Sequence, residues 1–314
     1  MTLRVFIDGA AGTTGLDIAE RLGGRNDLAL LTLPDDRRKD PEARREALNI
    51  ADAVILCLPD DAAREAVALI ENPQVKVIDA STAHRVAEGW TYGFAELEPG
   101  QREALSVATR ISNPGCYPTG FLALVRPLVR AGLVPADWAF TVNATSGYSG
   151  GGKAMIAAFE DASSADATDT AFRIYGLTLA HKHVSEMQQH AGLAFPPLFA
   201  PAVARTYRGM IVEVPLQLSA MATTPSAQDL RDALTTAYEG SALVSVHGDD
   251  NPSVLALEQC AGTDRLELYV FANESTGQAR LVAALDNLGK GAGGAAVQNL
   301  NLALGFPEML GLTL

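Results

Sequence analysis

Short apolar runs separated by mixed segments dominate the N-terminal part of the chain. Residues 3–7, 28–33, 53–58 and 75–79 are rich in Leu, Ile and Val, and each run ends at a polar turn. Continuous apolar runs of this kind are typical of strands that are buried on both faces of a parallel sheet. Because segments with helical spacing lie between them, the pattern predicts an α/β, Rossmann-type domain that binds its ligand at the carboxyl ends of the strands.

After Arg208 the pattern changes to strands with few intervening helices. Strand-like stretches follow at 210–216, 243–246, 265–271 and 279–285. Such an arrangement predicts a largely antiparallel sheet in a second, α+β domain.

The length of 314 residues allows two domains that each bury a core of their own. We expect residues 1–115 to form the dinucleotide-binding domain, completed by the C-terminal helix within 287–314. Residues 116–286 are expected to form the second domain, for which the family resemblance given below implies catalysis, substrate binding and oligomerisation.

Composition and charge exclude several classes of protein. The net charge of −13 argues against a general nucleic-acid or acidic-membrane surface. No apolar run approaches the roughly 20 residues that cross a bilayer, and Met1 leads into a strand without the layout of a signal peptide. Cys57, Cys116 and Cys260 are too widely spaced for a disulfide framework or a metal site. We therefore expect a cytoplasmic protein that acts on a small molecule, without a metal.

A glycine-rich turn follows the first predicted strand. Gly9, Gly12 and Gly15 are spaced G-x-x-G-x-x-G, and Thr13 and Thr14 open the helix that follows. Glycines allow close backbone approach, and a helix N-terminus supplies N–H donors, so the turn predicts a pyrophosphate cradle. Glycine-rich turns of purely structural origin are the alternative, since the spacing departs from the usual fingerprint.

The turn after the second strand bears on the choice of cofactor. Asp35 and Asp36 are followed by Arg37, Arg38 and Lys39. An acidic side chain there suits a ribose 2′-hydroxyl, whereas a cation accommodates a 2′-phosphate. Three consecutive cations favour NADP, and a solvated charged loop is the competing interpretation.

The segment Ser112–Thr119 contains the strongest candidate for a nucleophile. Cys116 follows a Pro-Gly turn, and Pro118 lies where a helix would begin before the apolar run 121–129. A helix N-terminus favours the thiolate, which is the form that attacks a carbonyl carbon. A small buried cysteine is the alternative.

Three further stretches carry candidate polar groups. Arg85 lies just past the end of the fourth strand, where it could contact an anion or form a surface salt bridge. Residues 145–153 read as a flexible loop closed by Lys153, which could wrap a phosphate or be a plain loop. His181 and His183 lack the further ligands of a zinc site, and a histidine that moves protons to and from a cysteine-bound intermediate fits better.

These motifs together resemble the short form of the N-acetyl-gamma-glutamyl-phosphate reductases, members of the semialdehyde dehydrogenase-like superfamily. The similarity spans the glycine turn, Ser112–Thr119, Ser146–Gly150, His181–His183 and Asp286–Asn299. The cysteine and C-terminal segments are its specific parts. Lys153 stands where the family usually has arginine, and a lysine keeps the charge without the planar fork.

The resemblance implies roles for individual residues. Cys116 would be the nucleophile and His181 the acid–base group, with NADPH as the cofactor. Its implied cofactor contacts are Gly9, Gly12, Thr13, Thr14, Gly15, Arg37, Arg38, Asn287, Gly289 and Lys290. Its implied substrate contacts are Arg85, Asn113, Ser149, Lys153, His183 and Glu186.

The implied reaction passes through a thioester on Cys116 and yields N-acetyl-glutamate 5-semialdehyde and phosphate, a step of arginine biosynthesis, in a homo-oligomer (dimer or tetramer). Two alternatives stay open: another acyl-phosphate reductase such as an aspartate-semialdehyde dehydrogenase, or a non-catalytic NADP-binding sensor.

Overall fold

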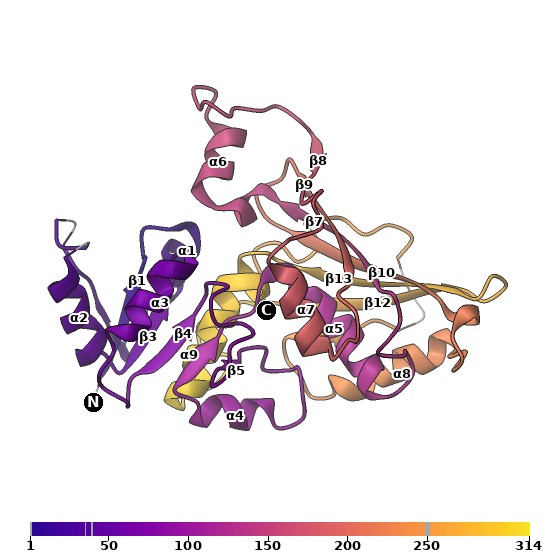
Figure 1. The fold of residues 1–314 in the computed structure, drawn as a ribbon, viewed down its shortest axis with the longest axis horizontal. Coiled ribbons are helices and arrows are strands. Elements are labelled where there is room, and N and C mark those ends of the chain that lie inside the picture. The colour runs from indigo at the N-terminus through magenta and orange to yellow at the C-terminus, as the bar shows by residue number, and fades with distance from the viewer. Residues whose placement is uncertain (1, 35, 39, 249–251) are drawn as a thin grey trace. The chain divides into compact units, whose positions relative to one another are not determined.

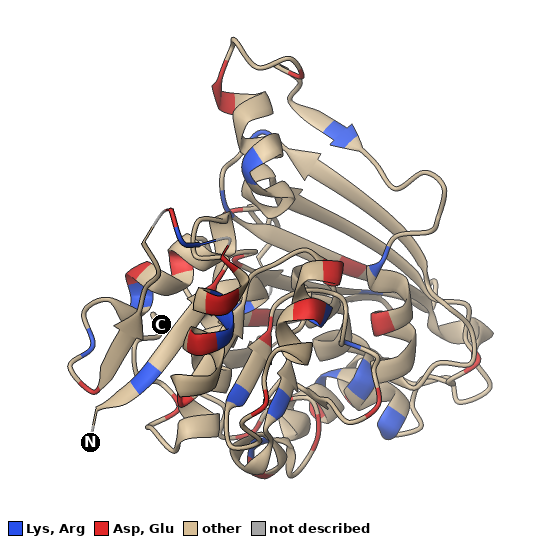
Figure 2. Cartoon of the chain, turned by 60° about the vertical axis from the view of Figure 1, so that its left-hand side comes forward, with Lys and Arg blue, Asp and Glu red and all other residues tan. Residues whose placement is uncertain are grey.

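The computed structural model describes residues 2–34, 36–38, 40–248 and 252–314. It divides into two compact units, residues 1–115 with 292–312, and residues 116–291 with the last two residues. None of the described helices is long and apolar enough to cross a membrane. In Figure 2 the charged residues lie mostly on helices and connections, and the strands contain few of them.

Unit 1 is built on a sheet whose described strands are all parallel, in the order β2-β1-β3-β4-β6-β5. The strands are β1 (Leu3–Asp8), β2 (Leu28–Leu31), β3 (Ala53–Leu56), β4 (Lys76–Asp79), β5 (Thr91–Tyr92) and β6 (Arg110–Ser112). All four residues of β3 are buried, as expected for a central strand covered on both faces. The doubly wound α/β fold is thereby confirmed.

Helices cover both faces of this sheet. They are α1 (Thr13–Leu22), α2 (Pro41–Ile50), α3 (Asp60–Ala68), α4 (Gln101–Val107) and α9 (Gly294–Leu304). Val5 and Ile55 face a core shared with α1 and α9, whereas Phe6 and Val54 face a core shared with α2 and α3. The alternation follows from the two-residue period of a strand. In Figure 1, α9 lies beside α4 and β4, although it comes from the far end of the chain.

Unit 2 contains a mixed sheet in the order β11-β12-β13-β10-β7-β9-β8. Its strands are β7 (Thr141–Gly147), β8 (Phe172–Ile174), β9 (Leu198–Ala204), β10 (Met210–Gln217), β11 (Val244–Val246), β12 (Leu266–Asn273) and β13 (Gln278–Leu285). Over the described residues, only β11–β12 and β7–β9 are parallel pairs, so the predicted antiparallel character holds for most of the sheet.

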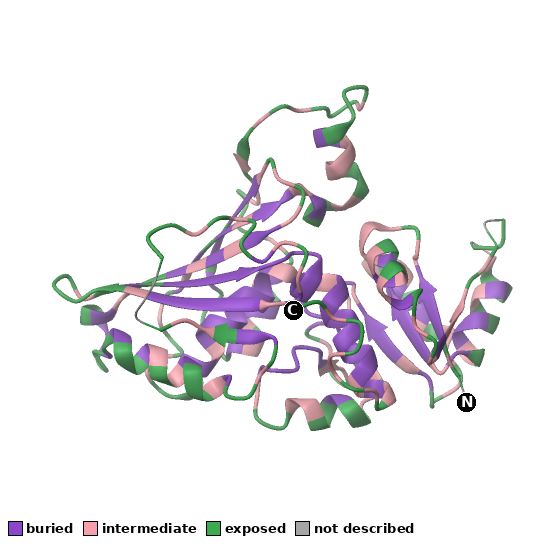
Figure 3. Ribbon diagram, turned by 180° about the vertical axis from the view of Figure 1, so that it is seen from behind, coloured by how far each residue is buried: buried purple, intermediate pink, exposed green. Residues whose placement is uncertain are grey.

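The helices of unit 2 are α5 (Cys116–Arg130), α6 (Gly152–Glu160), α7 (His183–Ala191) and α8 (Ala227–Ala237), with a short π-helix over Gly289–Gly293. Helix α5 packs on β10, β12 and β13 and on helices α7 and α8. Gly120 makes this close packing possible, because a Cβ there would lie 2.8 Å from a methyl carbon of Val212. Figure 3 shows α5 almost wholly buried.

Two stretches differ from the sequence-based expectation. The sequence before the Cys116 turn predicts a strand over 106–111, but strand β6 begins only at Arg110. Residues 101–107 form α4 instead, and from this helix buried Leu105 packs into the unit 1 core. Residues 145–153 were expected to form a flexible loop. Instead β7 continues to Gly147, which pairs with Ala204, and helix α6 starts at Gly152.

Candidate active site

Two glycines of the turn after β1 are required by the fold itself. Gly9 has φ +92°, and a Cβ there would lie 2.3 Å from the carbonyl oxygen of Cys57. A Cβ on Gly15 would lie 2.4 Å from the carbonyl oxygen of Gly9. No side chain fits either position, so the turn can hold its tight path only with glycine.

Gly12 is different, because the protein leaves room for a side chain there. Its φ is −75°, and the nearest atom to an added Cβ is the carbonyl oxygen of Gly9 at 3.4 Å. Beside it the buried hydroxyl of Thr13 has no hydrogen-bond partner within the described chain. An open glycine at a helix N-terminus with an unused donor nearby fits a dinucleotide pyrophosphate. Thr14 lies in the same first turn of α1.

A cavity of about 590 Å³ opens beside this turn, entirely within unit 1. Its wall includes residues 9–11 of the turn, the residues that follow β2, and Asp36, Arg38 and Arg44. Arg37 lies instead along a separate open groove beside Glu42, and it pairs with Asp40 at 3.5 Å. The predicted Asp35 and Lys39 lie outside the described residues.

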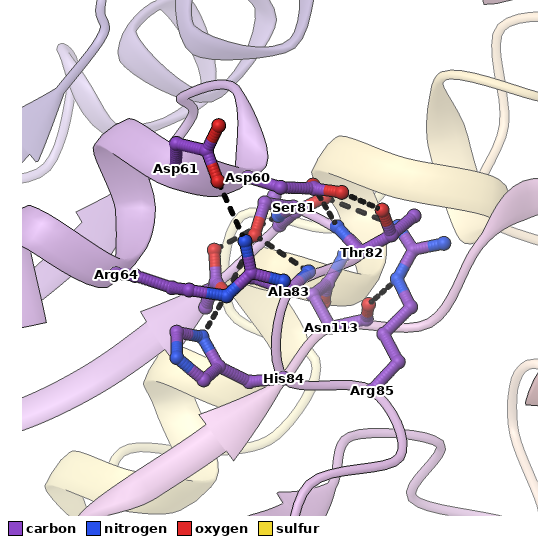
Figure 4. A network of polar contacts seen from close by, with 11 residues as sticks. Asp60, Asp61, Arg64, Ser81, Thr82, Ala83, His84, Arg85 and Asn113 are labelled. Atoms are coloured by element: carbon purple, nitrogen blue, oxygen red, sulfur yellow. Dashed lines mark hydrogen bonds and ion pairs between the residues drawn. The ribbon is translucent and has the colours of Figure 1, made fainter. Parts of the chain in front are cut away.

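A polar network fixes the segment that follows β4 (Figure 4). The fully buried carboxylate of Asp79 accepts hydrogen bonds from the Ser81 hydroxyl at 2.7 Å and from Nδ1 of His84 at 2.6 Å. The ring of His84 stacks on Trp90 with 4.0 Å between centroids. Asp60, at the start of α3, accepts from the backbone N–H and the hydroxyl of Thr82.

Arg85 and Asn113 are both buried and both brace the turn before Cys116. Nε of Arg85 donates to the carbonyl oxygen of Asn113 at 3.0 Å, and Nη2 donates to that of Ala80 at 3.1 Å. The amide of Asn113 donates to the carbonyl of Ala292 and accepts from Asn299, both at 3.0 Å. These contacts fix the backbone three residues before Cys116 in the chain.

Cys116 is the first residue of the 15-residue helix α5 and is half-buried. This is the position that the sequence predicted, where unpaired N–H groups and the helix dipole favour a thiolate. Burial raises the pKa of Cys57 to about 12, with the charges of Asp79 and Asp8 adding to the effect. Burial, with Glu267 adding, likewise raises the pKa of Cys260 to about 12, so both remain thiols at neutral pH.

The ring of His181 lies among aromatic side chains close to the start of α5. It meets the ring of Tyr117 edge-on at 6.4 Å and that of Tyr175 at 5.9 Å. The backbone N–H of His183 donates to Nδ1 of His181 at 3.2 Å. Since Nδ1 is an acceptor, the neutral ring carries its proton on Nε2. Burial and the charge of Lys182 lower the pKa of His181, which favours this neutral form.

His183 and Glu186 lie on one side of helix α7 and are both buried. The ring of His183 is 4.7 Å from that of His181 and 5.9 Å from that of Tyr117. The rings of both histidines thus lie next to that of Tyr117, the residue that follows Cys116.

Residues 286–291, the first part of the C-terminal segment that carries the resemblance, lie in unit 2. Asn287 donates to the hydroxyl of Ser149 at 2.8 Å and accepts from the backbone N–H of Gly209 at 3.0 Å, so its amide is used within the protein. Gly289 allows contact with Thr263, and Lys290 is almost fully buried. By contrast, Lys153 is exposed at the start of α6.

Sequence reasoning missed several groups of this site. Tyr117 and Tyr175 share a hydrogen bond of 3.0 Å, and burial raises the pKa of Tyr175 to about 12. Arg44 pairs with Asp8 at 2.8 Å. Asp8 could have been singled out, because it is a charged residue at the carboxyl end of a buried strand.

Two family models match the chain. The semialdehyde dehydrogenase NAD binding domain matches residues 36–105, and the semialdehyde dehydrogenase dimerisation domain matches residues 116–287. A dinucleotide cradle in one unit and a helix-start thiol in the other define a protein of the semialdehyde dehydrogenase class.

Full-length relatives narrow the class. The N-acetyl-gamma-glutamyl-phosphate reductase of Trichormus variabilis is 52% identical over 98% of this chain and 99% of its own length. Among solved structures, aspartate semialdehyde dehydrogenase II from Vibrio cholerae has a TM-score of 0.70 at 18% identity, covering 97% of this chain and 99% of that one. The Candida albicans aspartate semialdehyde dehydrogenase with NADP has a TM-score of 0.66 at 15% identity, covering 96% and 98%. The chain belongs to the N-acetyl-gamma-glutamyl-phosphate reductase family.

Proposed function

We propose that this chain reduces N-acetyl-L-glutamyl 5-phosphate to N-acetyl-L-glutamate 5-semialdehyde, with release of phosphate, in L-arginine biosynthesis. The observation that carries the proposal is a helix-start thiol that is followed in the chain by Tyr117, whose ring meets that of a neutral histidine. Cys116 opens α5, and His181, with its Nε2 proton available, contacts the neighbouring Tyr117. A nucleophile and an acid of this kind are what acyl transfer from a phosphate requires.

The chain's own residues account for the covalent steps. The thiolate of Cys116 attacks the acyl carbon, the bond to the phosphate oxygen breaks, and a thioester forms. When bound, NADPH supplies the hydride that reduces this thioester. Nε2 of His181 donates to the oxygen on which negative charge develops at each tetrahedral stage. Collapse of the hemithioacetal breaks the C–S bond and returns the thiolate.

The substrate contacts are also a proposal. Arg85 and Asn113 hold the backbone before Cys116 through buried hydrogen bonds, which supports a part in placing the reacting carbonyl. His183 and Glu186, buried beside His181, are proposed to position the substrate, and Ser149 and Lys153 to approach its phosphate. We assign the turn of Gly9 to Gly15 to the cofactor. The parts of Asn287, Gly289 and Lys290 in cofactor binding stay predictions from the resemblance, since the amide of Asn287 is used within the protein.

One assay tests the reaction. Purified protein is given N-acetyl-L-glutamate 5-semialdehyde, phosphate and NADP⁺, and reduced nucleotide is followed at 340 nm, with L-aspartate 4-semialdehyde as the matched substrate. We expect NADP⁺ to be reduced with N-acetyl-L-glutamate 5-semialdehyde only when phosphate is present, and not with L-aspartate 4-semialdehyde. Turnover of the aspartate compound instead would assign the chain to a different acyl-phosphate reductase. Nucleotide binding without turnover of either would point to a sensor.

We also propose a homo-oligomer formed through the unit 2 sheet, and a cytoplasmic location that keeps the Cys116 thiol reduced. The dimerisation-domain match over residues 116–287 supports the first. Size-exclusion chromatography with light scattering would test it, since a single-chain mass would contradict it.

A further inference from the structure

Among the described residues, the cations that line the unit 1 cavity are only partly those that follow one another in the sequence. Arg38 and Arg44 line the cavity of unit 1, and Arg37 lines a different groove. Arg44 comes from the first turns of α2, several residues beyond the run that the sequence singled out. The cavity also takes in the residues directly after β2, where a dinucleotide fold reads the adenosine ribose.

Arg44 is held in a fixed orientation by Asp8. Both Nε, at 3.2 Å, and Nη2, at 2.8 Å, donate to one oxygen of the Asp8 carboxylate. The Arg44 side chain is 17% exposed and that of Asp8 is 8% exposed, so the pair is largely shielded from water. Within the described residues, Nη1 of Arg44 has no hydrogen-bond partner.

An anchored guanidinium with unused N–H groups suits recognition of an oxyanion. Arginine presents five N–H donors in a rigid plane, and Asp8 occupies two of them. Because the orientation is already fixed, little side-chain entropy is lost when the remaining donors bind a ligand. Arg38, which is exposed, adds a second positive charge to the same cavity.

We infer that Arg44 is a cofactor-specificity residue that binds the 2′-phosphate of NADP, with Arg38 as its exposed partner. The inference rests on the proposed function, in which NADP is the cofactor. Arg37, in contrast, takes no direct part. Asp36 lies on the same wall and would oppose a phosphate, whereas it would accept a hydrogen bond from a free 2′-hydroxyl, so the two cofactors make opposite demands on this cavity.

Two nucleotide fragments isolate the interaction from catalysis. Adenosine 2′,5′-bisphosphate and 5′-AMP differ only in the 2′-phosphate, and calorimetric titration of each into the purified full chain gives their ratio of dissociation constants. We expect the wild-type chain to bind the bisphosphate at least about tenfold more tightly, the scale of a charge-assisted hydrogen bond. Arg44→Ala should remove most of this preference while changing 5′-AMP affinity less than about threefold.

Arg45→Ala is the matched control. Arg45 is the next residue of α2, but it lines the other groove and pairs with Glu71, so its loss should leave the ratio unchanged. Arg44→Ala leaves the Asp8 carboxylate without its partner, so the double variant Asp8→Asn with Arg44→Ala, which removes that charge, is measured as well. Arg44→Lys keeps the charge without the fork and should retain part of the preference.

The measured ratios of dissociation constants can support or overturn the assignment of Arg44. A wild-type ratio near one, or a ratio that survives in folded Arg44→Ala and in the double variant, overturns the assignment. A ratio lost with Arg37→Ala but kept with the Arg44 variants would return the role to Arg37 and overturn it too. Because no acyl phosphate is involved, a chain that fails the reductase assay can still pass or fail this one.

Discussion

Alanine at Gly9 and at Gly12 should have opposite effects, although the two residues are three apart in one turn. At Gly9 the left-handed φ of +92° costs an alanine about 1–2 kcal/mol. The Cβ would also lie 2.3 Å from the Cys57 carbonyl oxygen, and relieving such an overlap typically costs about 1–3 kcal/mol more. Gly9→Ala should therefore destabilise the chain by about 2–5 kcal/mol and lower its melting temperature by roughly 5–15 °C.

At Gly12 the backbone φ of −75° suits alanine, and the nearest contact of 3.4 Å is an ordinary one. The stability change should stay within about 1 kcal/mol, because alanine also restricts the unfolded chain. The added methyl group would, however, fill the space that a pyrophosphate approaches. We expect NADPH affinity to fall by about tenfold or more.

Differential scanning fluorimetry without nucleotide and titration of NADPH measure the two effects separately. Gly15→Ala, with its predicted overlap at 2.4 Å, serves as a second case of the Gly9 type. If the melting temperature of Gly12→Ala were as low as that of Gly9→Ala, the conclusion that a Cβ fits at Gly12 would be wrong. If it bound NADPH as tightly as the wild type, the cradle would not hold the pyrophosphate.

Cys116→Ala should abolish turnover and spare NADPH binding, whereas Cys57→Ala and Cys260→Ala should stay active. Iodoacetamide at pH 7 should modify Cys116 first, since burial raises the pKa of the other two thiols to about 12; mass spectrometry that found another site first would contradict this. His181→Asn should mainly lower kcat and His183→Asn mainly raise KM, and the reverse pattern would exchange their roles. Burial lowers the pKa of His181 below its usual value of about 6.5, so its contribution to stability is present above that pH and lost as the pH falls. Urea unfolding between about pH 7.5 and pH 5 should show a shallower decline for His181→Asn, and equal slopes would refute the sign.

The parts of the fold that the sequence predicted well are those governed by local pattern. The run from Leu3 to Ile7 is a buried strand, and Cys116 begins a helix, because apolar continuity and a Pro-Gly turn act over a few residues. Gly147 shows the limit. The sequence predicts a flexible loop around this glycine. A Cβ there would lie 2.6 Å from the carbonyl oxygen of Tyr207, so the glycine is required by tertiary packing.

The candidate site shows the same difference between features that local sequence predicts and features that depend on tertiary contacts. The proposed nucleophile, Cys116, could be chosen from its own turn, since helix polarity is a local property. Arg44 could not, because its role depends on reaching Asp8 from another element, 36 residues away in the chain. Likewise, nothing in the sequence shows that the Asn287 amide is taken up by Ser149 and Gly209.

The position of helix α9 in the chain determines when the core of unit 1 can be completed during synthesis. Val297 and Leu300 complete the core that Val5 and Ile18 begin, so part of the unit 1 core is supplied by a helix that is synthesised after residues 116–291. Domains generally fold as they leave the ribosome, N-terminal part first. Here the unit 1 sheet must keep part of one apolar face exposed while residues 116–291 are synthesised. A chain truncated before Gly294 would thus damage a unit whose other residues are 1–115.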